Sequence, residues 1–257
     1  MLFIKSFNIF KINLILKYRD SLLGYFWTII NPLSFSIILI ALNFFNLINQ
    51  NTNNQDYFIY VFSGLTTWSI FSDTIKINTN NFSMLKNIFG KLKVDFKTIF
   101  ISSFYEILLN FILRFLVFLI ILFIFLPNFN FYSLVFNIFL IFITLIPLGI
   151  LFYLLFFPLS FLFLDSGKIL SPLISFLFIS SSAVIYSSTN KIFEIFHTYN
   201  PIAYLLDMLR SSINKEMIEF SSYINLFILF IIFTMLSFLF YKIFIKKIPI
   251  LIDRSSN

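Results

Sequence analysis

The chain has 257 residues, of which 60% are hydrophobic and only 11% are charged, and its formal net charge is +7. Soluble domains contain about 25% charged residues, so this composition excludes an ordinary soluble protein and favours a protein embedded in a lipid bilayer. The lack of cysteine excludes disulfides and thiolate metal sites, and the single histidine, His197, excludes a histidine-rich metal site.

The first 20 residues combine basic and apolar side chains at helical spacing. The apolar positions that share one face are Phe3, Phe7, Phe10, Leu14 and Tyr18. Basic residues lie beside this face, as is typical of a helix that lies along a membrane surface. Residues 1–20 are therefore predicted to form an interfacial helix; the alternative is a frayed basic tail.

The rest of the chain contains long apolar runs separated by short polar segments. A membrane-spanning helix needs about 20 mostly apolar residues. The runs that meet this need predict six spans in an all-α, single-domain polytopic membrane protein (1–257): 22–46, 57–75, 98–126, 132–157, 169–187 and 222–241.

The 18 lysines and arginines predict how these spans are oriented. Most of them fall in the N-terminal segment, in the loops at 76–97 and 164–168, and in the C-terminal tail. Because positive residues accumulate on the cytoplasmic side of membrane proteins, both termini are expected in the cytoplasm and the protein in the cytoplasmic (inner) membrane.

Nothing in the sequence resembles an ATP-binding loop. A P-loop needs a glycine, four residues, and then Gly-Lys followed by Ser or Thr. Gly90-Lys91 and Gly167-Lys168 are followed by leucine and isoleucine, and both lack the upstream glycine. If the protein uses ATP, the ATPase is another chain, and we expect this chain to bind no cofactor.

A line of polar residues runs through the predicted third span. Ser102, Glu106, Asn110 and Arg114 are four residues apart and so share one helix face. Charges within a span usually face other protein or water and mark function. The alternative is that Glu106 lies at the headgroup level and that Arg114 extends towards it.

The segment 191–219 is amphipathic and precedes the last span. Asn200 is predicted to cap a helix that begins at Pro201, because asparagine favours the cap position and proline the first helical position. Two short extracytoplasmic helices that enter the membrane without crossing it fit this segment. A pair of solvated surface helices is the alternative.

Two motifs resemble the ABC-2 type permeases that export polysaccharides, a family that includes the O-antigen, capsular-polysaccharide and teichoic-acid exporters. The second motif, "NPIAYLLDMLR", contributes Asn200, Pro201 and Arg210. The first, in "YRDSLLGYFWTIINP", is carried by Arg19, Ser21, Leu23, Gly24, Trp27 and Pro32.

The resemblance implies a homodimer that works with two copies of a separate ABC ATP-binding subunit, which holds ATP and Mg. It implies re-entrant helices before the last span and close helix approach at Gly24. It also places an ATPase-coupling helix in 80–97, although this loop lacks the prolines common there in the family. The coupling residues would be Leu85, Lys86, Ile88, Phe89, Leu92 and Lys93.

The substrate implied by the resemblance is a lipid-linked glycan, with no role for nucleic acid. A glycan path should mix aromatic rings with hydroxyls, amides and a few charges. The candidate path residues are Tyr25, Thr28, Glu106, Asn110, Arg114, Ser175, Ser182 and Tyr186. The alternatives are an ABC-2 permease for a drug or simple lipid, and a membrane glycolipid transferase, for which a catalytic cluster of carboxylates or histidines is missing.

Overall fold

The computed structural model describes residues 2–19, 21–45, 54–89, 96–125, 131–162, 166–181, 183, 195, 198–214 and 219–255. These residues are almost entirely helical and include no strand, which confirms the predicted all-α class. The elements are α1 (Leu2–Tyr18), the 3-10 turn η1 (Gly24–Phe26), α2 (Trp27–Phe44), α3 (Asn54–Phe89), α4 (Phe96–Phe125), α5 (Phe131–Leu162), α6 (Ser166–Ser180), α8 (Pro201–Ile213) and α9 (Phe220–Ser255).

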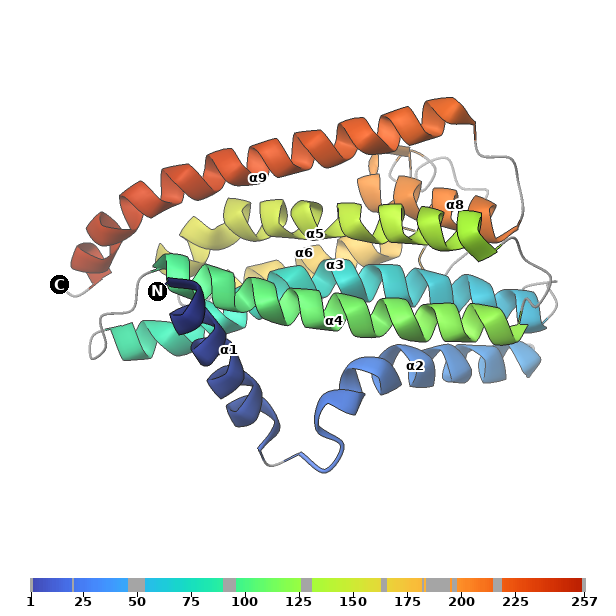
Figure 1. Cartoon of the computed structure of the whole chain (residues 1–257), viewed down its shortest axis with the longest axis horizontal. Helices are drawn as coiled ribbons and strands as arrows, with labels where there is room; N and C mark the ends of the chain where they lie inside the picture. Colours follow the sequence, from blue (N-terminus) through green and yellow to red (C-terminus); the bar gives the residue numbers. More distant parts are fainter. Residues whose placement is uncertain are drawn as a thin grey trace.

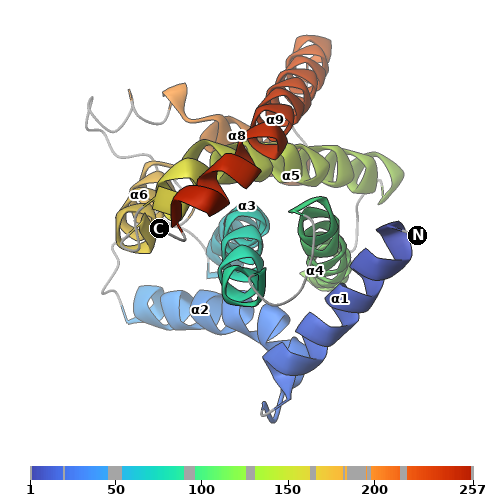
Figure 2. The same cartoon turned by 90° about the vertical axis from the view of Figure 1, so that its left-hand side faces the viewer.

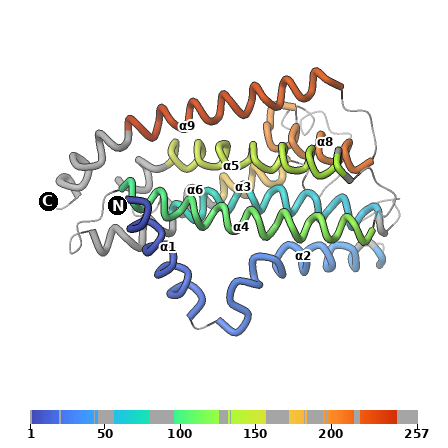
Figure 3. Tube along the Cα trace, viewed as in Figure 1, coloured from blue at the N-terminus to red at the C-terminus, as the bar shows by residue number. Residues whose placement is uncertain are grey.

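The long helices lie lengthwise in Figure 1, and in Figure 2, taken along the long axis, α3 and α4 are nearly end-on whereas α2 and α5 lie obliquely. Both ends of the chain lie at the same end of the bundle, and α8 lies at the opposite end. Seen along the axis, α3 occupies the middle, with the other long helices around it (Figure 2). The Cα trace shows α1 and α2 meeting at a sharp bend away from the bundle (Figure 3). We call the described residues of this bend, 19 and 21–26, the elbow.

Four helices in the described part of the chain are long and apolar enough to cross a membrane. They are Gly24–Leu42, Phe96–Phe125, Leu134–Phe156 and Phe220–Ile243. These ranges match the predicted spans 22–46, 98–126, 132–157 and 222–241. The other two predicted spans are not among them: 57–75 lies within α3, and 169–187 begins in α6, which is described over 15 residues.

Helix α3 is central although it is rich in polar side chains. Ser63, Thr66, Thr67 and Thr74 are all buried, and each donates its hydroxyl to a carbonyl oxygen three or four residues earlier in the same helix. Such self-satisfied hydroxyls pack well against other helices but add little hydropathy. This composition explains why α3 is less apolar than the four helices that are apolar enough to cross a membrane.

Helix α3 also extends further than predicted. It continues without a break from Asn54 to Phe89 over 36 residues. The first half of the predicted coupling region 80–97 is therefore a continuation of α3, and Leu85, Lys86, Ile88 and Phe89 belong to this helix. Leu92 and Lys93 lie outside the described residues.

Two glycines let helices approach closely. A Cβ at Gly149 of α5 would lie 1.5 Å from Thr74 Oγ1 and 3.0 Å from the Phe71 carbonyl oxygen of α3. A Cβ at Gly64 of α3 would lie 1.8 Å from the carbonyl oxygen of Ala183, just beyond α6. Small residues serve this purpose in membrane bundles, where close backbone packing replaces the hydrophobic effect.

Gly24 has a different role from the one predicted. A Cβ there would meet only the Tyr18 Cβ, at 4.0 Å, so space is available. Its φ is +50°, in the left-handed region that glycine adopts without steric cost. Gly24 is therefore required by the backbone turn of the elbow, and no helix of the described chain approaches it closely.

The predicted N-terminal helix is present as α1, and it packs on α4. The rings of Phe7 and Phe10 lie 5.6 and 5.9 Å from the ring of Tyr105. Of the predicted apolar face, Phe10 is buried, whereas Phe3 is 66% exposed. One part of this face therefore contacts protein, and another is left for lipid or solvent.

Candidate functional site

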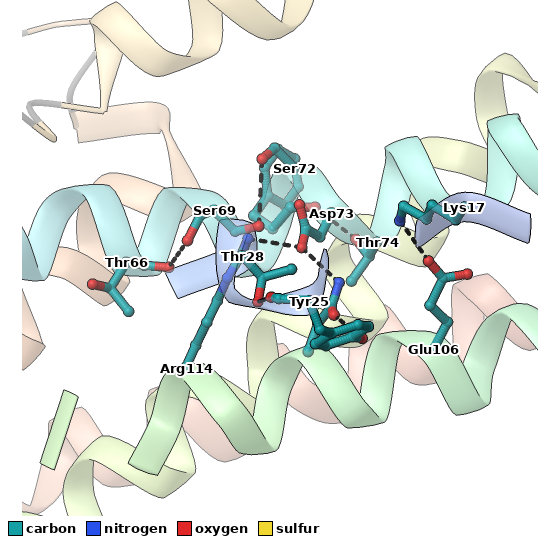
Figure 4. A network of polar contacts seen from close by, with 12 residues as sticks. Lys17, Tyr25, Thr28, Thr66, Ser69, Ser72, Asp73, Thr74, Glu106 and Arg114 are labelled. Carbon is teal, nitrogen blue, oxygen red and sulfur yellow. Dashed lines mark hydrogen bonds and ion pairs between the residues drawn. The ribbon is translucent and has the colours of Figure 1, made fainter. Parts of the chain in front are cut away.

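Six polar side chains from α1, the elbow, α3 and α4 meet inside the bundle, and we call them the polar network (Figure 4). They form two sets of contacts that lie one after the other along α4 (Figure 4). The members are Lys17, Tyr25, Asp73, Glu106, Asn110 and Arg114.

Helix α4 contributes the longest row of polar residues. Ser102, Glu106, Asn110 and Arg114 are all buried, as expected for residues four apart on one inward face. Their shared burial confirms the predicted helix face. Burial in an otherwise apolar helix means that the two charged groups and the amide need partners from other elements, whereas the Ser102 hydroxyl makes no hydrogen bond within the described structure.

The Arg114 guanidinium finds that partner on α3. Its Nη2 lies 2.9 Å from Oδ2 of Asp73, and the two side chains are 7% and 20% exposed. This pairing differs from the alternative in which Arg114 extends towards Glu106. Arg114 Nε and Nη1 are buried and make no hydrogen bond within the described structure, so two donors remain for a water molecule or a ligand oxygen.

Asn110 joins the elbow to the ion pair. Its Nδ2 donates to Asp73 Oδ2 over 2.9 Å, and its Oδ1 accepts from the Tyr25 hydroxyl. An amide can donate and accept at once, so it fixes both neighbours. The Tyr25 ring packs in turn against Tyr18 at 5.0 Å, which connects the network to the end of α1.

A second ion pair ties α1 to α4. Lys17 Nζ lies 2.7 Å from Glu106 Oε1, with the lysine side chain 42% exposed and the glutamate side chain 3% exposed. Burial alone would lower the pKa of the Lys17 ammonium, but the hydrogen bond and the charge of Glu106 outweigh burial and raise that pKa above its ordinary value. Lys17 therefore stays charged at physiological pH.

The network is balanced in charge: Lys17 faces Glu106, and Arg114 faces Asp73. It offers hydroxyl, amide, carboxylate and guanidinium groups within an apolar bundle, a mixture that suits a hydroxyl-rich ligand. The described residues contain no group of three or more His, Asp or Glu side chains that could hold a metal ion.

The structure leaves some predicted path residues apart from the network. Thr28 donates to the Tyr25 carbonyl oxygen over 2.8 Å and thereby supports the first turn of α2. Ser175 is exposed on α6, far along the chain from these contacts. Ser182 and Tyr186 lie outside the described residues.

Sequence reasoning missed Asp73 and Lys17. Asp73 is the only charged residue in the predicted span 57–75, and this isolation was the available signal. A lone acid in a span requires a partner, and Arg114 was the lone base in the next span. Lys17 was treated only as part of a basic surface.

The residues of the first motif lie around the elbow. The Ser21 hydroxyl accepts from the Gly24 backbone N–H over 3.0 Å, which closes the turn. Leu23 and Trp27 are 45% and 46% exposed, Arg19 is also exposed, and Pro32 lies inside α2. The motif thus forms a turn whose outer surface is free to contact lipid or another chain.

The second motif forms α8 and its cap. The Asn200 side chain accepts from the Ile202 backbone N–H over 3.0 Å, and Pro201 is the first helical residue, as predicted. Arg210 lies in the last turn. At 13 residues, α8 is about 20 Å long, too short to cross a bilayer. The other short helix predicted in 191–219 falls largely outside the described residues.

Comparison with family models and with curated proteins gives no match.

Proposed function

We propose that this chain is the membrane-spanning permease subunit of an ATP-driven ABC exporter. Its substrate is a lipid-linked polysaccharide of the O-antigen or capsule type, which it moves out across the cytoplasmic membrane. The observation that carries the proposal is the elbow: the motif that resembles polysaccharide exporters is also the segment that brings Tyr25 into the polar network. An enzyme of glycolipid transfer would instead need a catalytic cluster.

In the proposed topology, six spans place both termini in the cytoplasm. Both ends of the chain lie at one end of the bundle and α8 at the other, which agrees with an even number of crossings (Figure 1). Most lysines and arginines fall in segments that this topology assigns to the cytoplasm.

Cysteine labelling tests this topology against a clean background, because the chain has no cysteine. Asn214 follows α8 and Lys97 begins α4, and both are exposed. In intact cells, Asn214→Cys should react with an impermeant thiol reagent, whereas Lys97→Cys should react only after the membrane is opened. Labelling of position 97 from outside would contradict the topology.

The chain is proposed to act as a homodimer bound to two ATP-binding subunits. Only 11% of each of the spans Gly24–Leu42 and Phe220–Ile243 is buried within the chain. Phe35, Ile37 and Ile38 of α2 are about half exposed, so α2 has an apolar face available for a second copy or for lipid. One copy leaves little room for a glycan, whereas a path between two copies can be wide.

The test of function is depletion and rescue in the source cells. Loss of the chain should abolish the surface glycan and leave lipid-linked glycan inside the cell. An ABC ATPase should co-purify with the chain. Tyr25→Phe removes one hydroxyl from the polar network and should lower export while ATPase association persists. Ser221→Ala, a change at an exposed position of α9, is the matched control and should rescue fully.

Normal surface glycan in depleted cells would refute the glycan substrate. ATPase activity stimulated by drugs or simple lipids would then favour the second type of ABC-2 permease. Sugar transfer by the purified chain without ATP would favour a transferase.

A further inference from the structure

Both ends of α8 are tied to the segment where α6 ends. At its beginning, Asn200 Nδ2 donates to Ser180 Oγ over 3.0 Å and to the Leu177 carbonyl oxygen over 3.4 Å. The same side chain caps α8 through its Oδ1. One amide therefore starts α8 and fastens it to α6.

Near its C-terminal end, α8 is held by Arg210. The guanidinium carbon lies 3.5 Å from the centre of the Tyr60 ring of α3, a cation–π contact. Arg210 Nη2 also donates to the carbonyl oxygens of Tyr60 and Ala183, over 3.4 and 3.3 Å. A single side chain thus joins α8, α3 and the residues that follow α6.

The Ala183 carbonyl is held from two sides. It accepts from Arg210, and it also lies against Gly64 of α3 so closely that a Cβ there would be 1.8 Å away. Ala183 is therefore packed closely against Gly64 of α3, and the hydrogen bond from Arg210 keeps it in that position.

Arg210 differs from Arg114 in a way that bears on movement. Arg114 is 7% exposed and faces a carboxylate, so its release would leave a charge in an apolar interior. Arg210 is only half-buried, and its bonds to the two carbonyl oxygens are long. A released Arg210 can regain water, so opening this contact costs less than releasing Arg114 would.

We propose that Arg210 is a positioning residue that pins α8 and the end of α6 to α3 as one clamp, and that the clamp opens as a unit when Arg210 leaves the Tyr60 ring. The clamp lies at the end of the bundle opposite the chain termini (Figure 1). The clamp rests on contacts alone, and only its role in exporting a substrate rests on the proposed function.

A buried reporter in α8 can measure opening. Ser212 is 8% exposed, and Ser212→Cys is a nearly isosteric change that gives the chain its only thiol. Thr144→Cys, at a position of α5 that is 1% exposed, provides a second reporter on a helix that carries none of the clamp residues. Each is labelled with a small thiol reagent in the full-length protein purified into lipid nanodiscs.

Arg210→Met should raise the labelling rate at position 212 by about tenfold, a factor between those expected from losing an exposed and a desolvated cation–π contact. Tyr60→Leu should do the same. Tyr60→Phe keeps both the ring and the carbonyl and should label more slowly than Tyr60→Leu. Arg210→Lys keeps the charge but not the planar group and should fall between the parent and Arg210→Met. Labelling at position 144 should stay slow throughout.

Slow labelling at 212 in both Arg210→Met and Tyr60→Leu would overturn the clamp, as would equal acceleration at 144, which would indicate general loosening. If Arg210→Met does not accumulate, Tyr60→Leu decides alone. Because labelling uses no glycan, accelerated labelling without any glycan export would count against the proposed function and leave the clamp standing.

Discussion

Replacing Asp73 with leucine is expected to destabilise the folded bundle strongly. The change leaves Arg114, which is 7% exposed, without its carboxylate, and it removes an acceptor from Asn110. Removing one partner of a buried ion pair costs about 3–5 kcal/mol, because the remaining charge stays buried and unpaired. The purified variant should melt well below the parent in a thermal unfolding assay, and less of it should accumulate in membranes.

The matched control removes both charges. Asp73→Leu combined with Arg114→Met buries no charge and should recover most of the lost stability, since apolar replacements of a buried pair are often neutral. A double variant as unstable as Asp73→Leu alone would show that Asp73 acts through shape or through Asn110 rather than by neutralising Arg114.

Replacing Gly149 with leucine is expected to force α5 away from α3. The first added carbon alone would lie 1.5 Å from Thr74 Oγ1 and 2.7 Å from Thr74 Cβ, with the Phe71 carbonyl oxygen at 3.0 Å. Thr74 is β-branched and buried, and the carbonyl belongs to the helix backbone, so neither can turn aside. Overpacking of this kind costs about 1–3 kcal/mol or more. The melting temperature in detergent should fall accordingly.

A smaller pair of changes separates steric overlap from other effects of the substitution. Gly149→Ala should destabilise less than Gly149→Leu, and adding Thr74→Gly should relieve the overlap at the cost of a weaker α3. If Gly149→Leu melts at the same temperature as the parent, α3 and α5 are not in close contact at Gly149.

The sequence predicted those parts of the fold that depend on local chemistry. Asn200 and Pro201 define the start of α8 through one hydrogen bond and one fixed φ, so a short motif is sufficient. The inward face of α4 follows from four polar residues at helical spacing. Neither prediction needs knowledge of which helices are neighbours.

The parts that were missed depend on neighbours. Asp73 and Arg114 meet because α3 and α4 pack side by side with a particular axial register, which no local pattern specifies. Gly24 was assigned to close packing because glycine serves both purposes, and only its φ of +50° separates them. The roles of Ser182 and Tyr186 in a substrate path stay predictions.

The polar composition of α3 has a consequence for biosynthesis. Under the proposed topology, α3 leaves the ribosome before α4, carrying Asp73 and a row of hydroxyls. Asp73 lies near the end of the predicted span 57–75, so it opposes transfer of α3 alone into lipid by less than the about 2.5–3.5 kcal/mol of an acid at the centre of a span. The base that balances Asp73 is made only later, as Arg114 of α4. The place of α3 in the bilayer is therefore set by the assembled bundle, and its integration depends on helices that are synthesised after it.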